Sequence, residues 1–305
     1  MQTLWSLEQA NLQGVWLTIG SFDGVHRGHQ AIIKKLVTSA HNAVGSSVVL
    51  TFYPHPATVL RDRIGPYSLT TVDEKAQILG VLGVDYVIIH PFSKELAKFT
   101  ARQFILLLKN HLGLAHLLAG HDFALGRNRE GNFAMLTELG KELNFSVNLM
   151  RPITIQGEVI SSSRIRTLIA EGNVMGANSL LGHDYSVQGK VVHGDGRGRV
   201  LGIPTANLEI PSEKMMPYNG VYAGIATVKG KKYRAVSNIG IRPTFQSDSN
   251  FPRIETHLLG FYSDLYGERI ELSFHTRLRD EMRFPDLPTL IAQIHLDIEK
   301  TKLLL

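Results

Sequence analysis

The sequence predicts a chain in two parts: a doubly wound α/β parallel sheet, followed by a β-barrel with a C-terminal helix. In the first part, short apolar runs alternate with segments whose apolar residues recur at helical spacing, as in βαβ units. From about residue 183, short β-type runs punctuated by Gly and Pro take over. The length of 305 residues also suits about two domains. We therefore predict domains over residues 1–182 and 183–305.

The strands of the first part are predicted from apolar runs that stop at Gly, Pro or polar turns, which suits strands buried in a parallel sheet. These runs are Val15–Ile19, Ser47–Phe52, Tyr86–His90, His116–Ala119 and Val147–Met150. Apolar residues at helical spacing predict helices around Ile32–Ala40, Val72–Leu82, Ala101–His111 and Ile165–Ala170.

The second part contains β-type runs at Ser186–Val192, Gly220–Val228, Tyr233–Ile239, Arg253–Phe261 and Arg269–His275. Their spacing and turn residues favour a sandwich or barrel. A last helix is predicted over Leu287–Lys302, because Leu290, Ile291, Ile294 and Ile298 share one of its faces. We expect that face to pack on the barrel.

Composition excludes several classes of protein. Without cysteine the chain has no disulfides, thiolate metal sites or Cys nucleophile. No apolar run is long enough to span a bilayer and no secretory signal is visible, so we expect a cytoplasmic protein without a membrane partner. The net charge of +5 divides into +3 for residues 1–182 and +2 for residues 183–305. Such an even spread favours phosphate chemistry over nucleic-acid binding; a homo-oligomer stays open.

The segment Gly20-Ser-Phe-Asp-Gly-Val-His-Arg-Gly-His29 follows the first predicted strand and opens a helix. Open α/β sheets bind ligands at the carboxyl ends of their strands, and a helix N-terminus offers N–H groups to a phosphate. His26 and His29, three residues apart, could donate hydrogen bonds to charge that develops on a phosphoryl group. Simple helix capping is the alternative, but the pair of histidines favours a functional role.

This segment is neither G-x-G-x-x-G nor a P-loop. It resembles the H-x-G-H nucleotidyltransferase superfamily, which has a Rossmann-like fold and moves the α-phosphate of ATP. The resemblance implies nucleotide transfer with pyrophosphate as leaving group and no covalent intermediate, so that catalysis is positioning plus electrostatics. It assigns His26 and His29 to catalysis, and contacts with ATP to Gly20, Phe22, Asp23, Gly24, His26 and His29.

A second piece, Ser161-Ser-Ser-Arg-Ile-Arg166, precedes a predicted helix. Serines suit an N-cap, but arginines at a helix start oppose the helix dipole, so we expect an anion nearby. The superfamily has a similar serine-rich segment with Arg that binds the ATP phosphates. The resemblance carries this role to Ser161, Ser162, Ser163, Arg164 and Arg166.

Two further segments resemble bacterial FAD synthetases. Thr51-Phe-Tyr-Pro-His-Pro56 is similar to their T-F-x-P-H-P segment, and Gly120–Gly131 to their G-x-D-F-x-F-G segment. The resemblance implies that both line the flavin-nucleotide and ATP clefts, through His55, Pro56, Asp122, Phe123 and Asn128. For His55 a structural role is the alternative. Tyr53 replaces a common acidic residue and Leu125 a common aromatic one, and the effect of these departures on adenylylation stays open.

Residues 189–207 combine glycines, Arg197 and Arg199 with the sequence Pro204-Thr-Ala-Asn207. A long hairpin loop is the alternative reading of the glycines, but N–H groups beside arginines also form phosphate sites. Thr and Asn two residues apart in an extended strand point to one side, and their oxygens suit Mg²⁺ held with ATP phosphates. The segment resembles the riboflavin kinase family, whose P-T-A-N motif holds Mg–ATP. The resemblance assigns ATP and Mg²⁺ binding to Gly189, Gly194, Gly198, Gly202, Thr205 and Asn207, the last two as metal ligands.

A kinase that acts on a primary hydroxyl needs a carboxylate near the nucleophile. Glu255 lies inside a predicted strand near the apolar residues Ile254 and Leu258. Acidic side chains are rare at such positions unless they have a partner or a function. The riboflavin kinase family assigns the general base to the Glu of E-x-H, which here is Glu255. A salt bridge to Arg242 or Arg279 is the alternative. The resemblance also assigns riboflavin binding to Arg279, Glu281 and Phe284.

The two resemblances, in this order, match the bacterial bifunctional riboflavin kinase/FAD synthetase family over nearly the whole chain. They imply that the barrel converts riboflavin and ATP to FMN, and that the α/β domain adenylylates FMN with ATP to give FAD. Three alternatives stay open: a kinase without adenylylation, a transferase for another small molecule with a ligand-binding barrel, and a nucleic-acid binder.

Overall fold

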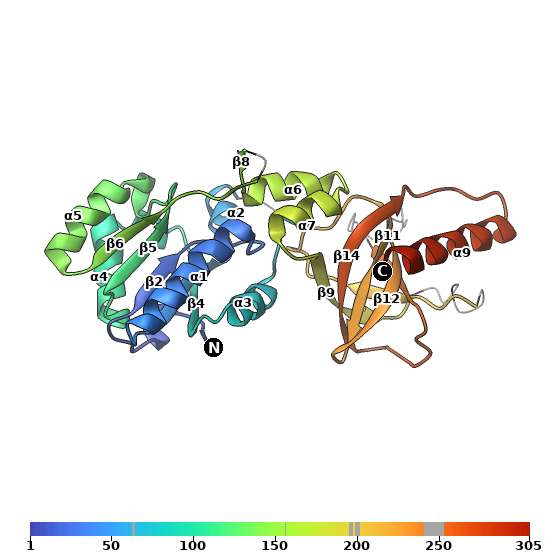
Figure 1. Cartoon of the computed structure of the whole chain (residues 1–305), viewed down its shortest axis with the longest axis horizontal. Helices are drawn as coiled ribbons and strands as arrows, with labels where there is room; N and C mark the ends of the chain where they lie inside the picture. Colours follow the sequence, from blue (N-terminus) through green and yellow to red (C-terminus); the bar gives the residue numbers. More distant parts are fainter. Residues whose placement is uncertain (63–64, 156, 195–197, 199–201, 241–252) are drawn as a thin grey trace. The chain divides into compact units, whose positions relative to one another are not determined.

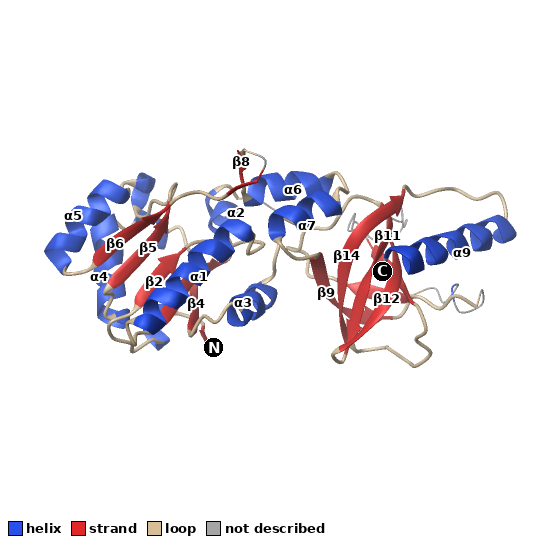
Figure 2. Ribbon diagram, viewed as in Figure 1, coloured by secondary structure: helices blue, strands red, loops and turns tan. Residues whose placement is uncertain are grey.

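The computed structural model describes residues 1–62, 65–155, 157–194, 198, 202–240 and 253–305. The described residues form two compact units, Met1–Ser162 and Ser163–Leu305 (Figure 1). The first contains a six-stranded parallel sheet with helices, and the second a closed six-stranded barrel with a C-terminal helix (Figure 2). The predicted fold class is confirmed.

The sheet of the first unit has the strand order β1-β4-β3-β2-β5-β6, and all its pairings are parallel. After β2 the chain adds β3 and β4 on one side and then β5 and β6 on the other, so the strand order reverses beside β2, while β1 lies at the edge next to β4. Ligands of doubly wound sheets bind at such a point. The strands are β1 (Gln2–Leu4), β2 (Trp16–Ile19), β3 (Ser47–Tyr53), β4 (Tyr86–Pro91), β5 (His116–Gly120) and β6 (Ser146–Met150).

Helices cover both faces of this sheet because successive strand residues face opposite ways. Val48 and Leu50 pack in one core cluster with residues of α4 and α5, whereas Val49 packs in another with residues of α1 and α3. The helices of the first unit are α1 (Arg27–Asn42), α2 (Pro56–Leu60), α3 (Val72–Val81), α4 (Ala101–Leu112) and α5 (Phe133–Leu143), with short 3-10 turns η1 (Leu7–Gln9), η2 (Leu96–Lys98) and η3 (Arg127–Arg129). A small hairpin, β7 (Thr154–Ile155) with β8 (Glu158–Val159), follows the sheet.

The barrel closes in the order β10-β13-β12-β11-β14-β9, and neighbouring strands are antiparallel. Along β13 the buried residues Ile254, Thr256 and Leu258 alternate with partly exposed ones, which gives an inner and an outer face. The strands are β9 (Tyr185–Val192), β10 (Ala206–Glu209), β11 (Gly220–Val228), β12 (Lys231–Gly240), β13 (Arg253–Leu258) and β14 (Arg269–Arg279).

The described residues of the second unit also form helices α6 (Ser162–Ala170), which starts at the last residue of the first unit, α7 (Val174–Leu181) and α9 (Leu287–Leu304). Helix α7 packs on β14 and β9, and α9 packs on β12 and β11. Ile294 and Ile298 of α9 join a core cluster with Val221 and Val236, so the predicted packing of the last helix is confirmed. The predicted boundary at residues 182–183 divides the chain by function, whereas the two compact units divide it by contacts at Ser162 and Ser163. The functional boundary stays a prediction.

Several elements were not predicted from the sequence, among them helices α2, α5 and α7 and strands β1 and β10. Strand β1, at the sheet edge, was not predicted because three residues carry no readable periodicity. Strand β10 was not predicted because it directly follows the glycine-rich stretch and Pro204. Helix α1 begins at Arg27 with His26 as its N-cap, so the H-x-G-H segment opens the helix as expected. Among the described residues, no helix is long and apolar enough to cross a membrane.

Candidate active sites

The first site is built on the loop between β2 and α1, at the point where the strand order of the sheet reverses. Gly20 continues the sheet, since its N–H donates to the Leu50 carbonyl at 3.0 Å. Gly24 has φ +78°, a conformation that favours glycine. Phe22 is buried in the core beneath the loop. The loop is therefore held at Gly20 by the sheet and at Phe22 by the core.

Asp23 ties this loop to the segment before α3. Its carboxylate is 1% exposed and accepts hydrogen bonds from Leu69 N (3.0 Å), Thr70 N (3.0 Å) and Thr70 Oγ1 (3.2 Å). The Thr70 hydroxyl also lies 3.1 Å from Gly24 N. Asp23 thus has a structural task in shaping the loop, and its predicted contact with ATP stays a prediction.

His26 and His29 lie against each other at the start of α1. His26 is the N-cap: its Nδ1 accepts from His29 N at 3.3 Å. The two rings are stacked with centroids 3.6 Å apart, and the Phe22 ring meets His29 edge-on at 5.1 Å. The capping alternative is therefore real for His26, but the stacked pair is more than capping requires. A Cβ at Gly28 would lie 3.1 Å from the His26 ring, which explains the glycine between the histidines.

The electrostatics of the pair keep His29 neutral. Burial, and then the neighbouring His26 and Lys75, lower the pKa of His29 well below its ordinary value. Its Nδ1 is buried and has no hydrogen-bond partner among the described residues. Because Nδ1 of His26 accepts a hydrogen bond, the neutral form of that ring carries its proton on Nε2. A pair of imidazoles arranged in this way can donate hydrogen bonds to an anionic oxygen.

Lys75 is a residue of this site that the motifs do not include. It is 5% exposed, and its Nζ donates to Thr51 Oγ1 at 3.2 Å, at the carboxyl end of β3. Burial lowers the pKa of Lys75 to about 8, while the Asp23 carboxylate opposes the shift. One signal could have identified it: Lys75 lies between Val72 and Leu79, on the apolar stripe of a helix that a charged residue normally avoids.

The serine-rich segment starts α6. Ser162 Oγ donates to the Asp23 carbonyl at 2.9 Å, so this serine lies against the β2–α1 loop, and its role at the ATP phosphates stays a prediction. Ser163, Arg164 and Arg166 belong to the second compact unit, and their phosphate role stays a prediction. Ser161 comes directly before the helix.

The expected flavin-nucleotide segments show mainly structural contacts. His55 caps α2, with Nδ1 accepting from Ala57 N at 3.1 Å, and Pro56 is the first residue of that helix. Leu125 is 8% exposed and packs in the core with α4, so the aliphatic departure fills the interior. Tyr53 is 46% exposed. The residues predicted to line the cleft from the loop after β5 are Asp122, Phe123 and Asn128, of which Phe123 packs against the core and Asn128 has φ +53°.

The second site is a polar row on the outer face of the barrel. Asn207 of β10 lies opposite Glu255 of β13, and Glu255 lies opposite Asn238 of β12. All three are partly exposed, whereas their strand neighbours Ile254 and Thr256 are buried. The P-T-A-N asparagine and the predicted base are thus adjacent. Directly paired residues of neighbouring strands have Cβ atoms about 5 Å apart.

Glycines form a cradle around the P-T-A-N segment. A Cβ built on Gly194 would overlap the Asn207 amide, and one on Gly198 would lie 3.1 Å from Thr205 Oγ1. Ile203 N donates to the Gly198 carbonyl at 2.9 Å. Gly202 has φ +74°, and Gly189 backs onto the Glu209 carbonyl. Arg197 and Arg199 lie outside the described residues.

Of the three residues predicted to bind riboflavin, Glu281 contacts Asn238. Glu281 Oε1 accepts from Asn238 Nδ2 at 3.4 Å, so Glu281 reaches the polar row. Arg279 instead contacts Asp297 of α9, with Nη2–Oδ2 at 2.8 Å and Nε–Oδ2 at 3.0 Å, and its guanidinium lies 5.9 Å from the Phe284 ring. Of the two proposed salt-bridge partners of Glu255, Arg279 is therefore engaged elsewhere, and Arg242 lies outside the described residues. Riboflavin binding by these three residues stays a prediction.

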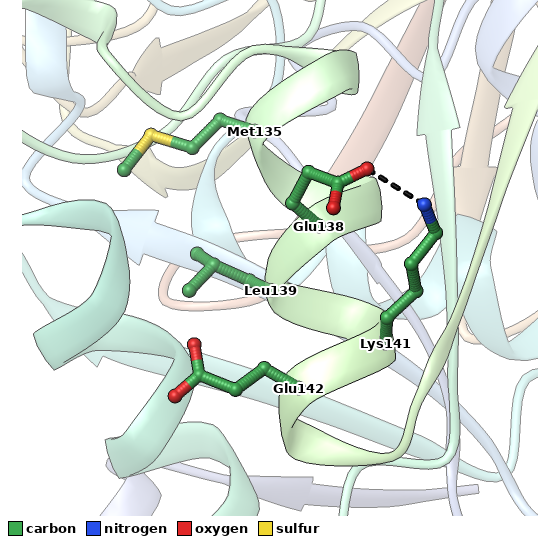
Figure 3. A pocket seen from close by; sticks show the side chains of 5 residues that line it. All are labelled: Met135, Glu138, Leu139, Lys141 and Glu142. Carbon is green, nitrogen blue, oxygen red and sulfur yellow. Dashed lines mark hydrogen bonds and ion pairs between the residues drawn. The ribbon is translucent and has the colours of Figure 1, made fainter.

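Two other features bear on ligand sites. No group of three His, Asp or Glu side chains in the described part of the chain could hold a metal ion. A surface hollow of about 570 Å³ lies on one face of α5, where Lys141 and Glu138 form an ion pair (Figure 3). None of the predicted site residues lines it.

Comparisons with known proteins match both halves of the chain. The FAD synthetase family model matches residues 8–164, and the riboflavin kinase family model matches residues 181–305. The chain is 39% identical over 294 residues to the bifunctional riboflavin kinase/FMN adenylyltransferase of Escherichia coli K12, covering 96% of this chain and 93% of the relative.

The chain belongs to the bifunctional riboflavin kinase/FMN adenylyltransferase family. The Haemophilus influenzae member is 37% identical over 306 residues, covering 99% of this chain and 98% of that relative. A crystal structure from Streptococcus pneumoniae, named macrolide-efflux protein, superposes with a TM-score of 0.88 at 30% identity and covers 99% of this chain and 98% of its own. The family resemblance predicted from the motifs is confirmed.

Proposed function

We propose that this chain makes FAD in two ATP-dependent steps. The barrel unit phosphorylates riboflavin to FMN with release of ADP. The α/β unit then transfers the adenylyl group of a second ATP to FMN, with release of pyrophosphate. The observation that carries this proposal is that FAD synthetase and riboflavin kinase domains occur in one chain. FMN, the product of the kinase reaction, is the substrate of the adenylyl transfer.

In the barrel, Glu255 accepts the proton of the riboflavin primary hydroxyl as that oxygen attacks the γ-phosphorus of ATP. Its position opposite Asn207 supports this role, because the nucleophile and the nucleotide must meet there. The side-chain oxygens of Thr205 and Asn207 fit Mg²⁺, which prefers hydroxyl, amide and phosphate oxygens. The glycines beside these two residues place only backbone atoms against them. Bound there, Mg²⁺ would neutralise charge on the ATP phosphates.

In the α/β unit, an FMN phosphate oxygen attacks the α-phosphorus of ATP, and the bond to the β-phosphate oxygen breaks. The His26 and His29 rings lie at the N-terminus of α1, where N–H groups and the helix dipole favour a phosphate. Burial keeps His29 neutral, and both rings can donate hydrogen bonds to the oxygens of the reacting phosphate. No group of the chain needs to form a covalent bond.

The test separates the two steps with two substrates. Wild-type protein with riboflavin, ATP and Mg²⁺ should give FMN and then FAD, resolved by chromatography, with ADP and pyrophosphate as coproducts. Glu255→Gln should abolish FMN formation but still convert supplied FMN to FAD. Glu209→Gln, an exposed acid on β10, is the matched control and should behave as wild type. Absence of any flavin product from the wild type would refute the proposal.

A further inference from the structure

The first unit buries a cation that its sequence motifs do not explain. Lys75, near the start of α3, makes one hydrogen bond through its ammonium group, to the neutral hydroxyl of Thr51, and forms no ion pair with a described residue. A buried ammonium normally has a carboxylate partner, because its desolvation is costly. The chain keeps this charge at a position where an apolar side chain would pack better.

We propose that the Lys75 ammonium binds phosphate oxygens of the nucleoside triphosphate in the α/β unit, which makes it a substrate-contacting residue of the adenylyl transfer. The inference rests on the proposed adenylyltransferase function and adds to it a residue outside the H-x-G-H and serine-rich segments. Lysine suits this task, since it presents a compact positive charge with three donors to a polyphosphate.

The position of Lys75 favours the nucleotide. Its partner Thr51 stands at the carboxyl end of β3, beside β2, and donates to the Ser21 carbonyl at 3.1 Å. Ser21 belongs to the loop that carries the histidines. Lys75 also lies close enough to His29 to lower the pKa of that ring. The ammonium therefore lies beneath the same loop that we assign to the phosphates.

A role as counter-ion of Asp23 is the main alternative. However, both carboxylate oxygens of Asp23 already accept hydrogen bonds, from Leu69 N, Thr70 N and Thr70 Oγ1. A buried carboxylate with three donors is well satisfied without a salt bridge. Asp23 therefore accounts for only part of the stabilisation that a buried ammonium requires.

A second polar group beside Lys75 points to the same ligand. His29 Nδ1 is buried and has no partner among the described residues. The Lys75 ammonium and His29 Nδ1 come from different helices and lie within electrostatic reach of one another. A ligand with several anionic oxygens could satisfy both groups, whereas a single acceptor of the protein could not. A polyphosphate supplies such oxygens.

The experiment compares Lys75→Met with Lys34→Met, which removes an exposed lysine of α1. For Lys75→Met we expect kcat/KM for FAD formation from FMN and ATP to fall about 10- to 100-fold, while FMN formation from riboflavin stays at the wild-type rate. The thermal shift caused by inorganic pyrophosphate, the product of the first site alone, should disappear. Lys34→Met should match the wild type in all three measurements.

Thermal unfolding without ligand distinguishes a ligand-binding role from a structural one. If Lys75 serves the nucleotide, Lys75→Met should unfold at the wild-type temperature or above, because a buried charge is removed. A lower unfolding temperature together with an unchanged pyrophosphate shift and unchanged FAD formation would overturn the proposal. A wild-type protein that makes FMN but no FAD would refute the proposed adenylyltransferase instead, so the two failures differ.

Wild-type crystals with a non-hydrolysable ATP analogue provide a test that does not depend on how the variant folds. We expect Lys75 Nζ within hydrogen-bond distance, about 3 Å, of a phosphate oxygen. An analogue bound at the β2–α1 loop with Lys75 Nζ still directed only at Thr51 would overturn the proposal.

Discussion

At Gly28 the chain has no side chain because the His26 imidazole occupies the space where a Cβ would go. A Cβ there would lie 3.1 Å from the ring, closer than ordinary van der Waals contact. The glycine of H-x-G-H therefore permits the stacked arrangement of the two histidines. The motif can be read from the sequence, but the stacking and the capping bond from His29 N to His26 Nδ1 need the structure.

Gly28→Val should displace the His26 ring and lower FAD formation about 5- to 150-fold, since overpacking of a fitted site costs about 1–3 kcal/mol. FMN formation should be unaffected. The rates of both reactions, measured on the same preparation, check this. Lys34→Ala on the exposed face of α1 is the control. Wild-type FAD formation by Gly28→Val would mean that the ring stacking has no role in the transfer.

Lys75 also predicts a pH dependence of stability. Its pKa is lowered from 10.5 in the unfolded chain to about 8 in the folded one. Between these values the unfolded state binds more protons, so the folded wild type gains stability relative to Lys75→Met as the pH rises from about 8 to about 10.5. The gain is at most about 3 kcal/mol. Urea unfolding of both proteins across this range measures it; a constant difference would contradict a buried, charged Lys75.

At the scale of elements, long-range ion pairs decide how α9 is held. Asp297 is 1% exposed and receives the Arg279 guanidinium from the end of β14, while Ile294 and Ile298 supply the apolar contacts. The sequence predicted the apolar face of this helix but not the acid buried on it. A residue pair far apart in the chain leaves no periodic signal. Lys75 did leave a periodic signal, because it lies on the apolar stripe between Val72 and Leu79, but its contact with Thr51 depends on what packs against that helix.

Asp297→Ala should destabilise the second unit by about 3–5 kcal/mol, because it leaves a partly buried guanidinium without its partner. The double variant Asp297→Leu with Arg279→Met should recover much of this loss. Denaturant unfolding of the wild type, Asp297→Leu, Arg279→Met and the double variant in a double-mutant cycle gives the coupling energy. Additive effects of the two single changes would show that the pair does not anchor the helix.

At the scale of the whole molecule, the strand and helix patterns and the order of the motifs were enough to predict both folds and which of them comes first in the chain. Apolar strand runs and turn glycines identified most strands of the sheet and barrel, whereas β1 was too short to stand out and β10 directly follows the glycine-rich stretch and Pro204. The adjacency of Asn207, Glu255 and Asn238 could not be predicted, because it depends on the register of three strands. Residue roles inside each site are therefore best tested by variants that separate the two reactions.

The most direct measurement of the two-site assignment is a product analysis of wild type, His29→Ala and Glu255→Gln, each given riboflavin or FMN with ATP and Mg²⁺. We predict that His29→Ala accumulates FMN from riboflavin without FAD. We predict that Glu255→Gln leaves riboflavin unchanged but converts FMN to FAD at the wild-type rate. Equal loss of both reactions in either folded variant would contradict the assignment of one reaction to each unit.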